Sequence, residues 1–407
     1  MYLYYKEWGL LEEMSQYYKR VQRKGIYRIS INELFFFIGV LIYSFESIVY
    51  QGSYVRMLLP DFFEQILKYS ALTIFIFVII ISKKSKKNTL TQLIIVPLFA
   101  LMTILISDTE IIIMVAALFA SQGISFRKII KNIRNFDLIW FLFVIILSIL
   151  KVIPNNTFTH LSNTAYSLGF FYYSNISVLV FWISVMSLYL KGINITYIDI
   201  AFFVFANYIA YMVATTRLQF FMSLLFVILL LIVRNKTISE YIAKITNLNF
   251  IVMFSISVIL SYAYAGKNQF ISQLNILLLN RIKFSYYALK DTGISLFGKK
   301  ILTISPEKVN GILDFKNYFY VDSGYIYTLV EYGIIFTIFV ILAYTIIINY
   351  AVQSNNKVIY LWCLITSLYS LINNCITNIV INPLLFLVIP LFLKRKYINK
   401  KNKVYNH

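Results

Sequence analysis

Charged residues are scarce in this chain. They make up 13% of its 407 residues, about half of the ~25% that a soluble domain carries. Apolar residues make up 60%, and the mean hydropathy is +0.75. A soluble fold cannot bury that much apolar surface, so the composition excludes an ordinary soluble protein. It predicts a polytopic membrane protein instead.

Cysteine and histidine are equally scarce, with two residues of each. Cys363 and Cys375 lie in one apolar segment, which indicates membrane-embedded thiols rather than a disulfide framework. His160 and His407 are far apart in the sequence and have no clustered carboxylates or thiolates beside them. This spacing argues against a metal site, so we expect no metal and no other cofactor.

Several common motifs are missing. The chain has no P-loop and no GxGxxG, so nothing indicates direct use of a nucleotide. No apolar core stands beside a small-residue cleavage site near the start, and we therefore expect no cleaved signal peptide. The net charge is +20, but the basic runs are short and lie at the ends of apolar segments. Without a soluble domain to hold a duplex, this pattern excludes nucleic acid as a partner.

What the sequence does contain is a series of long apolar runs. Each is near the ~20 residues that a helix needs to cross a bilayer. We predict an all-α protein of about twelve transmembrane helices, at 31–50, 62–82, 89–107, 110–125, 136–153, 165–190, 195–213, 218–233, 247–264, 323–350, 358–376 and 379–393. The break between the last two runs, "CITNIVINP", is also compatible with a re-entrant bend.

Lysine and arginine set the predicted orientation. If the N-terminus is cytoplasmic, most of the 37 basic residues fall on the cytoplasmic side, as the positive-inside rule requires. Both termini are then cytoplasmic. The predicted regions are a cytoplasmic N-terminus at 1–30, nine helices in 31–264, a large extracytoplasmic loop at 265–322, three helices in 323–393 and a basic cytoplasmic tail at 394–407. The N-terminus is either an amphipathic helix on the membrane surface or a solvated basic segment.

The large loop is basic although it lies outside the cytoplasm in this topology. A basic surface there suits an anionic ligand at the membrane, such as a lipid-linked diphosphate. The alternative is a solvated loop with ordinary lysines. Within it, "NRIKFSYYALKDTGISLFGKKI", from Asn280 to Ile301, predicts a short helix across the mouth of the protein with Arg281 at its start.

Three charged residues stand at or near predicted helices at the outer side. Arg217, in "MVATTRLQFF", occupies a tight junction, where an arginine either lines a cavity or snorkels to the interface. Asp322 and Glu331 belong to "YFYVDSGYIYTLVEYGIIF". Along one helix they would lie about 13–14 Å apart, too far for a close carboxylate pair. Asp322 is also a candidate N-cap for the helix that follows. A further outer turn, "SDTE", contains Asp108 and Glu110. Its acids either face the same cavity or, as we expect, Asp108 or Thr109 caps the following helix.

The order of these features resembles a known family. An arginine at a tight outer junction precedes a late large loop with "RIKFSYYAL" and "LFGKKI", and "VDSGYIYTLVEYGIIF" opens the next helix. This order is similar to that of the Wzy-type polysaccharide repeat-unit polymerases, in the superfamily shared with O-antigen ligases. The match covers about 265–340 and Arg217. The chain departs from the family in lacking a second glycine after "LFG" and the histidine that the ligases carry.

The resemblance implies a GT-C-like, metal-independent glycosyltransferase in the bacterial cytoplasmic membrane. Its substrates would be undecaprenyl diphosphate-linked oligosaccharides, with a chain-length regulator and a flippase as further candidate partners. An alcohol acceptor needs a general base, and the implied base is Asp322. The departing diphosphate needs cations, for which Arg281 and Arg217 are the first candidates.

Four further residues receive secondary roles from the same resemblance. Lys283 and Lys299 are additional contacts to the diphosphate. Glu331 has either a structural role or a contact to the acceptor sugar. Tyr325 either stacks on a sugar ring or belongs to the interfacial aromatic belt.

Two other functions are compatible with the composition. A lipid-linked oligosaccharide flippase or other transporter would also have about twelve helices, but such folds tend to contain two repeated halves, which we do not find here. A ligase that transfers finished glycan is the second, and the missing histidine favours the polymerase over it. The sequence leaves open the sugar and the choice among capsule, exopolysaccharide and O-antigen.

Overall fold

The computed structural model describes residues 30–82, 86–160, 163–266, 268–304, 307–309, 312–314 and 319–392. Almost all of the predicted N-terminal segment 1–30 and the whole predicted tail 394–407 lie outside these residues. The side chain of His160 is likewise not described.

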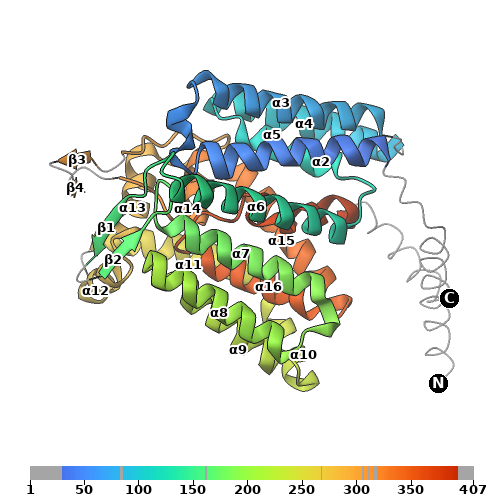
Figure 1. The fold of residues 1–407 in the computed structure, drawn as a ribbon. Coiled ribbons are helices and arrows are strands. Elements are labelled where there is room, and N and C mark those ends of the chain that lie inside the picture. The colour runs from blue at the N-terminus through green and yellow to red at the C-terminus, as the bar shows by residue number, and fades with distance from the viewer. Residues whose placement is uncertain are drawn as a thin grey trace.

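The described chain is almost entirely helical (Figure 1). The α-helices are α2 (Ile31–Ser44), α3 (Phe62–Ile81), α4 (Lys86–Ile106), α5 (Glu110–Ala120), α6 (Phe126–Ile149), α7 (Ser174–Lys191), α8 (Tyr197–Ala214), α9 (Arg217–Ile232), α10 (Lys236–Thr246), α11 (Asn249–Ala263), α12 (Gln269–Leu277), α13 (Arg281–Tyr287), α14 (Gly324–Glu331), α15 (Gly333–Gln353) and α16 (Lys357–Tyr369). Short 3-10 turns lie at Tyr54–Leu58, Gly192–Asn194, Tyr264–Gly266 and Pro383–Leu387, and π-helical turns at Phe45–Tyr50 and Ala288–Thr292.

Seven of the described helices are long and apolar enough to cross a membrane, at Ile31–Tyr50, Phe62–Ile81, Phe126–Ile149, Ser174–Lys191, Tyr197–Ala214, Asn249–Gly266 and Gly333–Gln353. Five shorter apolar helices, at Thr91–Ile106, Glu110–Ala120, Arg217–Ile232, Lys357–Tyr369 and Pro383–Phe392, lie in the other predicted segments. The protein is thus an all-α, multi-pass membrane protein. The crossing of all twelve segments remains a prediction.

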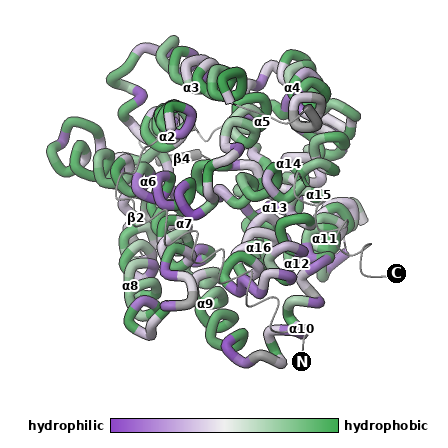
Figure 2. The backbone as a smooth tube through the Cα atoms, turned by 90° about the vertical axis from the view of Figure 1, so that its right-hand side faces the viewer, coloured by the Kyte–Doolittle hydropathy of each residue, from purple (hydrophilic) through white to green (hydrophobic). Residues whose placement is uncertain are grey.

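The helix bundle has two distinct ends. We call the end that carries β1 (Thr157–His160), β2 (Asn163–Tyr166), α12 and α13 the loop end (Figure 1). The opposite end, where Lys128, Lys191, Lys244 and Lys357 stand at helix ends, is the basic end. Figure 2 looks along the helices from the basic end. Apolar residues cover most of the long helices, and many hydrophilic ones lie at helix ends and connections.

Two short antiparallel hairpins were not predicted. β1 pairs with β2, with Thr157 opposite Tyr166, and β3 (Glu307–Val309) pairs with β4 (Ile312–Asp314) in the large loop. The helix predicted at 165–190 consequently begins later, at Ser174, because its first residues belong to β2 and the following turn.

The helix predicted at 136–153 begins ten residues earlier, at Phe126. The Ser125 hydroxyl caps it by accepting a hydrogen bond from the Lys128 backbone N–H at 3.4 Å. The charged first turns still place Ile129, Ile130 and Ile133 in the core. The helix therefore continues on its apolar face beyond the point where its composition becomes too polar for a membrane run.

The helix predicted at 323–350 is two helices. α14 ends at Glu331 and α15 begins at Gly333, whose φ of +82° breaks the helical path. The segment Ser295–Lys299 of the large loop lies against this break. Backbone N–H groups of Ile334 and Ile335 donate to the carbonyls of Ser295 and Leu296, at 3.0 and 3.2 Å.

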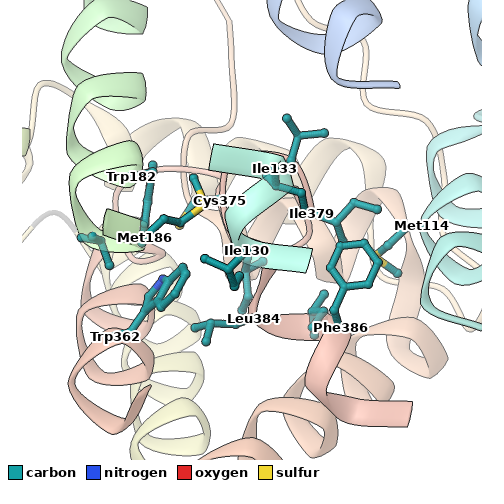
Figure 3. Packing of buried hydrophobic residues seen from close by; sticks show 14 of the residues in the cluster. Met114, Ile130, Ile133, Trp182, Met186, Trp362, Cys375, Ile379, Leu384 and Phe386 are labelled. Carbon is teal, nitrogen blue, oxygen red and sulfur yellow. The ribbon is translucent and has the colours of Figure 1, made fainter. Parts of the chain in front are cut away.

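The core lies between α5, α6, α7, α15 and α16. Figure 3 shows Ile130 and Ile133 of α6 facing Trp182, Trp362 and neighbouring apolar side chains. Cys363 and Cys375 are free thiols buried in this core, as the sequence predicts.

After α16 the chain runs irregularly from Ser370 to Asn382 while staying largely buried. The predicted helix 358–376 is therefore shorter and ends at Tyr369. Asn382 is fully buried and donates hydrogen bonds to Tyr344, Thr366 and the carbonyl of Cys375, at 3.2, 3.3 and 3.4 Å. Irregular backbone at membrane depth is tolerated where protein surrounds it, as here.

Candidate functional site at the loop end

Arg281 is held by a tight turn between α12 and α13. Leu279 and Asn280 both adopt the left-handed conformation, with φ of +54° and +66°. Asn275, which is buried, fixes the turn. Its side-chain nitrogen donates to Asn280 Oδ1, and its Oδ1 accepts from the Lys283 backbone N–H, both at 2.9 Å. Strained backbone that is held this firmly often marks a functional position, and α13 begins at Arg281 as the sequence predicts.

Asp322 is fixed by the residues that follow it. Ser323, which is the N-cap of α14, shares a 2.9 Å hydrogen bond between hydroxyls with Ser257 of α11. The Gly324 backbone N–H donates to the Ser370 carbonyl at 2.9 Å. The alternative prediction of Asp322 as the N-cap is therefore wrong, because Ser323 occupies that position and Asp322 is free to point elsewhere.

The structure brings Arg281 and Asp322 together. Arg281 Nε lies 3.0 Å from Asp322 Oδ2, and each side chain is 22% exposed. Burial raises the pKa of Asp322, and the Arg281 charge and hydrogen bond offset this rise only in part. Among the described residues, no hydrogen bond engages the two terminal guanidinium nitrogens of Arg281. They can therefore donate hydrogen bonds to an oxyanion as a second partner.

An apolar cavity of about 290 Å³ adjoins this pair. Among the residues that the structure describes, Arg281 is the only charged one that lines this cavity. The walls come from α9, α11, α13 and α16 and the flanking turns, and their lining residues are Met222, Leu225, Ser257, Leu260, Ser261, Leu278, Ile282, Ser285, Leu368, Leu371 and Ile372. A charged head beside an apolar chamber suits an amphiphilic anion.

Tyrosines surround the pair. The Tyr369 hydroxyl accepts a 2.9 Å hydrogen bond from Gln219 Nε2 in the first turn of α9. Burial raises the pKa of Tyr173, while the nearby Arg281 charge lowers it. Burial, Asp322 and Glu110 together raise the pKa of Tyr320 to about 12. The Tyr173 and Tyr320 hydroxyls stay protonated near neutral pH, whereas Tyr369 is fully buried.

Among the described residues, no hydrogen bond or ion pair joins the side chains of the other predicted cations to the pair. Arg217 is exposed at the first turn of α9, and in the described part of the chain it makes no hydrogen bond or ion pair with Arg281 or Asp322. Lys283 is half-buried within α13. Lys299 is exposed, and its backbone N–H donates to the Val330 carbonyl at 2.9 Å. Their roles as diphosphate contacts remain predictions.

Glu331 and Tyr325 face the interior. The Glu331 carboxylate is buried and accepts a hydrogen bond from the Ile301 backbone N–H, which ties the large loop to α14. This contact supports the structural role among the two predicted for Glu331. The Tyr325 ring is 1% exposed, and its hydroxyl donates to the Ser367 carbonyl at 3.1 Å. Tyr325 therefore packs in the core, and its ring is closed to a sugar in this structure.

A second polar cluster lies at the loop end, and its residues Glu46, Glu64 and Lys68 were not singled out from the sequence. Lys68 of α3 lies 3.1 Å from Glu64 and 3.7 Å from the buried Glu46. Asp108 accepts hydrogen bonds from the Glu110 backbone N–H at 2.9 Å and from the Tyr332 hydroxyl at 3.4 Å. The Asp108 carboxylate thus holds the first turn of α5, in line with the predicted capping role of "SDTE".

No family model, curated protein or solved structure matches this chain. Among the residues that the structure describes, no three His, Cys, Asp or Glu side chains form a group that could hold a metal ion. The candidate site therefore rests on its own geometry.

Proposed function

We propose that the protein is a polysaccharide polymerase that joins undecaprenyl diphosphate-linked repeat units. In this proposal the chain crosses the bacterial cytoplasmic membrane twelve times, with both termini in the cytoplasm and the loop end outside. The proposal rests on the family resemblance of the large loop and on the site at its base.

The observation that carries the proposal is the position of Arg281. Its guanidinium stands between the Asp322 carboxylate and an apolar cavity of about 290 Å³, with its two terminal nitrogens open. A lipid diphosphate has a polyanionic head and an apolar tail, and this arrangement offers a partner to each. A soluble anionic substrate would have no use for the apolar chamber.

Arg281 and Asp322 each have a role in the proposed reaction. The diphosphate of the donor binds the open nitrogens of Arg281. Asp322 then takes the proton of the acceptor hydroxyl, as that oxygen attacks the anomeric carbon of the donor sugar. The bond between this carbon and the diphosphate oxygen breaks, and Arg281 stabilises the negative charge of the leaving group. A raised pKa suits Asp322 to the role of base.

The test uses purified protein in liposomes with lipid-linked repeat units from the native host and without nucleotide. We expect a ladder of products spaced by one repeat unit. Arg281→Ala and Asp322→Ala should each reduce elongation by about 10²–10⁴-fold, the range for loss of an electrostatic or acid–base contribution. Gel electrophoresis of the extracted products measures both.

Lys191 and Asp199 provide matched controls, because they form a 3.1 Å ion pair away from the loop end, at the junction of α7 and α8. Lys191→Ala and Asp199→Ala should leave the ladder unchanged. Long products from Arg281→Ala at equal protein levels would refute the site. An unchanged single band from the wild type, with intact substrate, would refute the polymerase and direct attention to flippase activity.

A further inference from the structure

The helix α10 differs from its neighbours in length and surroundings. It joins the end of α9 to the start of α11 near the basic end (Figure 1). Its 11 residues extend about 16 Å, roughly half the thickness of a hydrocarbon core. It therefore cannot cross the membrane, although it connects two apolar helices.

Helical geometry divides α10 into three sectors at about 100° per residue. Ser239, Ala243 and Thr246 are buried, and the Ser239 hydroxyl lies 2.9 Å from the Tyr360 hydroxyl of α16. This buried sector fixes α10 to the bundle. Glu240 and Lys244 are exposed on a second, polar sector.

The third sector is apolar and exposed. Ile238 and Tyr241 of α10 are 41% and 65% exposed, and Leu248, in the turn that follows, is 59% exposed. The exposed apolar residues Leu231, Ile232, Ile251 and Val252 at the adjoining ends of α9 and α11 continue this surface. Because those two helices are apolar membrane segments, the same lipid that covers them reaches the third sector.

Positive charge borders the apolar sector. Lys244 Nζ lies 5.9 Å from the centre of the Tyr241 ring, and Arg234 Cζ lies 4.5 Å from that of Tyr197. Basic residues beside an apolar helix face attract acidic lipid headgroups, by about fivefold in binding for each charge.

We infer that α10 lies in the membrane surface at the basic end and binds acidic phospholipid headgroups through Arg234 and Lys244. Its apolar sector rests at the boundary between headgroups and acyl chains. The helix thereby anchors α9 and α11, which also line the cavity beside Arg281 through Met222 and Leu260. This inference does not depend on the polymerase proposal.

A depth measurement tests the placement. Tyr241→Cys and Glu240→Cys are each labelled with an environment-sensitive fluorophore in the full-length protein, in nanodiscs of phosphatidylcholine and phosphatidylglycerol. The native Cys363 and Cys375 are buried, which favours labelling at the introduced thiol. We expect a lipid-borne quencher to act on position 241 and a water-soluble quencher on position 240. Equal access of the water-soluble quencher to both positions would overturn the inference.

A second measurement tests the headgroup specificity. Phosphatidylglycerol should raise the thermal stability of the wild type above that in phosphatidylcholine alone. In the double variant Arg234→Gln/Lys244→Gln this rise should fall by about half or more, since both charges beside the apolar sector are lost. Lys128→Gln/Lys131→Gln on α6 removes two charges elsewhere and should retain most of it. An equal rise in both double variants would exclude headgroup binding by α10.

Discussion

At the scale of single residues, the Arg281–Asp322 pair explains how a carboxylate is kept in a largely buried position near lipid. An unpaired charge there would be costly, whereas a partner at 3.0 Å offsets part of that cost. The ion pair uses only Nε of Arg281. Among the described residues, its two terminal nitrogens have no hydrogen-bond partner and can bind a substrate. A diphosphate that binds the open nitrogens would weaken the hold of Arg281 on Asp322 and release the carboxylate as a base.

The raised pKa of Asp322 predicts opposite effects of pH on activity and stability. In the proposed mechanism Asp322 must be deprotonated to act as the base, so elongation should increase as pH rises above the ordinary aspartate value of about 4. The folded protein holds this proton more tightly than the unfolded chain, so the stabilisation is full below pH ~4 and is lost as pH rises through the folded pKa. Initial rates and melting temperatures between pH ~4 and ~7 measure both.

Asp322→Asn is the control for this behaviour. It should melt at a temperature that changes less over the same interval, because the titrating group is gone. If the wild type and Asp322→Asn show the same pH dependence of melting, the carboxyl does not titrate in this range.

The sequence identifies both members of the pair but not their contact. Arg281 stands out because it opens an amphipathic stretch, and Asp322 because it precedes an apolar run. Their contact spans 41 positions and depends on the turn at Asn275 and on the Ser257–Ser323 hydrogen bond. Asn275 gives no signal in the sequence, since a buried asparagine that caps a turn looks like any polar loop residue.

At the scale of elements, the crossing of the large loop and the α14–α15 break is the firmest constraint in the candidate region. Gly298 and Gly333 both have positive φ, at +91° and +82°. A Cβ at Gly298 would overlap the Glu331 carbonyl oxygen, and a Cβ at Gly333 would overlap the Gly298 backbone nitrogen. The two chains therefore meet backbone to backbone, which only glycine allows.

Gly298→Ala and Gly333→Ala should each destabilise the protein by more than about 2 kcal/mol, because strain at positive φ adds to a steric clash. Thermal unfolding in detergent, followed by circular dichroism, measures the change. A Cβ at Gly293 would meet nothing within 4 Å, but the φ of this residue is +75°. Gly293→Ala should therefore lower the free energy of unfolding by only about 1–2 kcal/mol.

Gly266→Ala completes the series. It meets no neighbour within 4 Å and has no positive φ, so it should leave stability nearly unchanged. A ranking in which Gly298→Ala is no worse than Gly266→Ala would contradict the backbone crossing.

The same crossing shows where prediction from sequence stops. Apolar runs locate helices such as 31–50 and 62–82 within a residue or two. They cannot reveal that 323–350 is broken at Gly333, because the break depends on Ser295–Lys299 far away in the chain. In α6 the error is local instead. The charged residues in the turns after Phe126 make this segment look too polar for a membrane run. The packed bundle shows that Ile129, Ile130 and Ile133 form an apolar face there.

At the scale of the whole molecule, the distribution of charged residues agrees with the distribution of apolar helices. Lys128, Lys191, Lys244 and Lys357 stand at helix ends at the basic end, whereas the β1–β2 hairpin and the short helices α12 and α13 lie at the loop end. The positive-inside rule then assigns the basic end to the cytoplasm. The candidate site at Arg281 and Asp322 would face the opposite side.

Cysteine labelling tests this orientation. Ser107 is exposed between α4 and α5 at the loop end, and Ser354 is exposed between α15 and α16. On intact cells, a membrane-impermeant maleimide should label Ser107→Cys fully. Ser354→Cys should react only after the cells are permeabilised. The wild type, with two buried thiols, should stay unlabelled in both cases.

The pattern of labelling distinguishes the possible errors. Reversed labelling would place the basic end outside, against the charge argument. Labelling of both variants from one side would mean that an even number of segments crosses between the two positions, against the twelve-helix topology.

The meeting of Gly298 with Gly333 also bears on how such a protein can diversify. A different loop between α11 and α14 must contain a turn that packs closely against the α14–α15 break. The backbones at Gly298 and Gly333 leave no space for a side chain between them. The large loop and the α14–α15 break must therefore change together in evolution. Recombination that exchanges 265–340 as a block should yield folded chimaeras, whereas exchange at a boundary between residues 298 and 333 should yield proteins that insert and fail to pack.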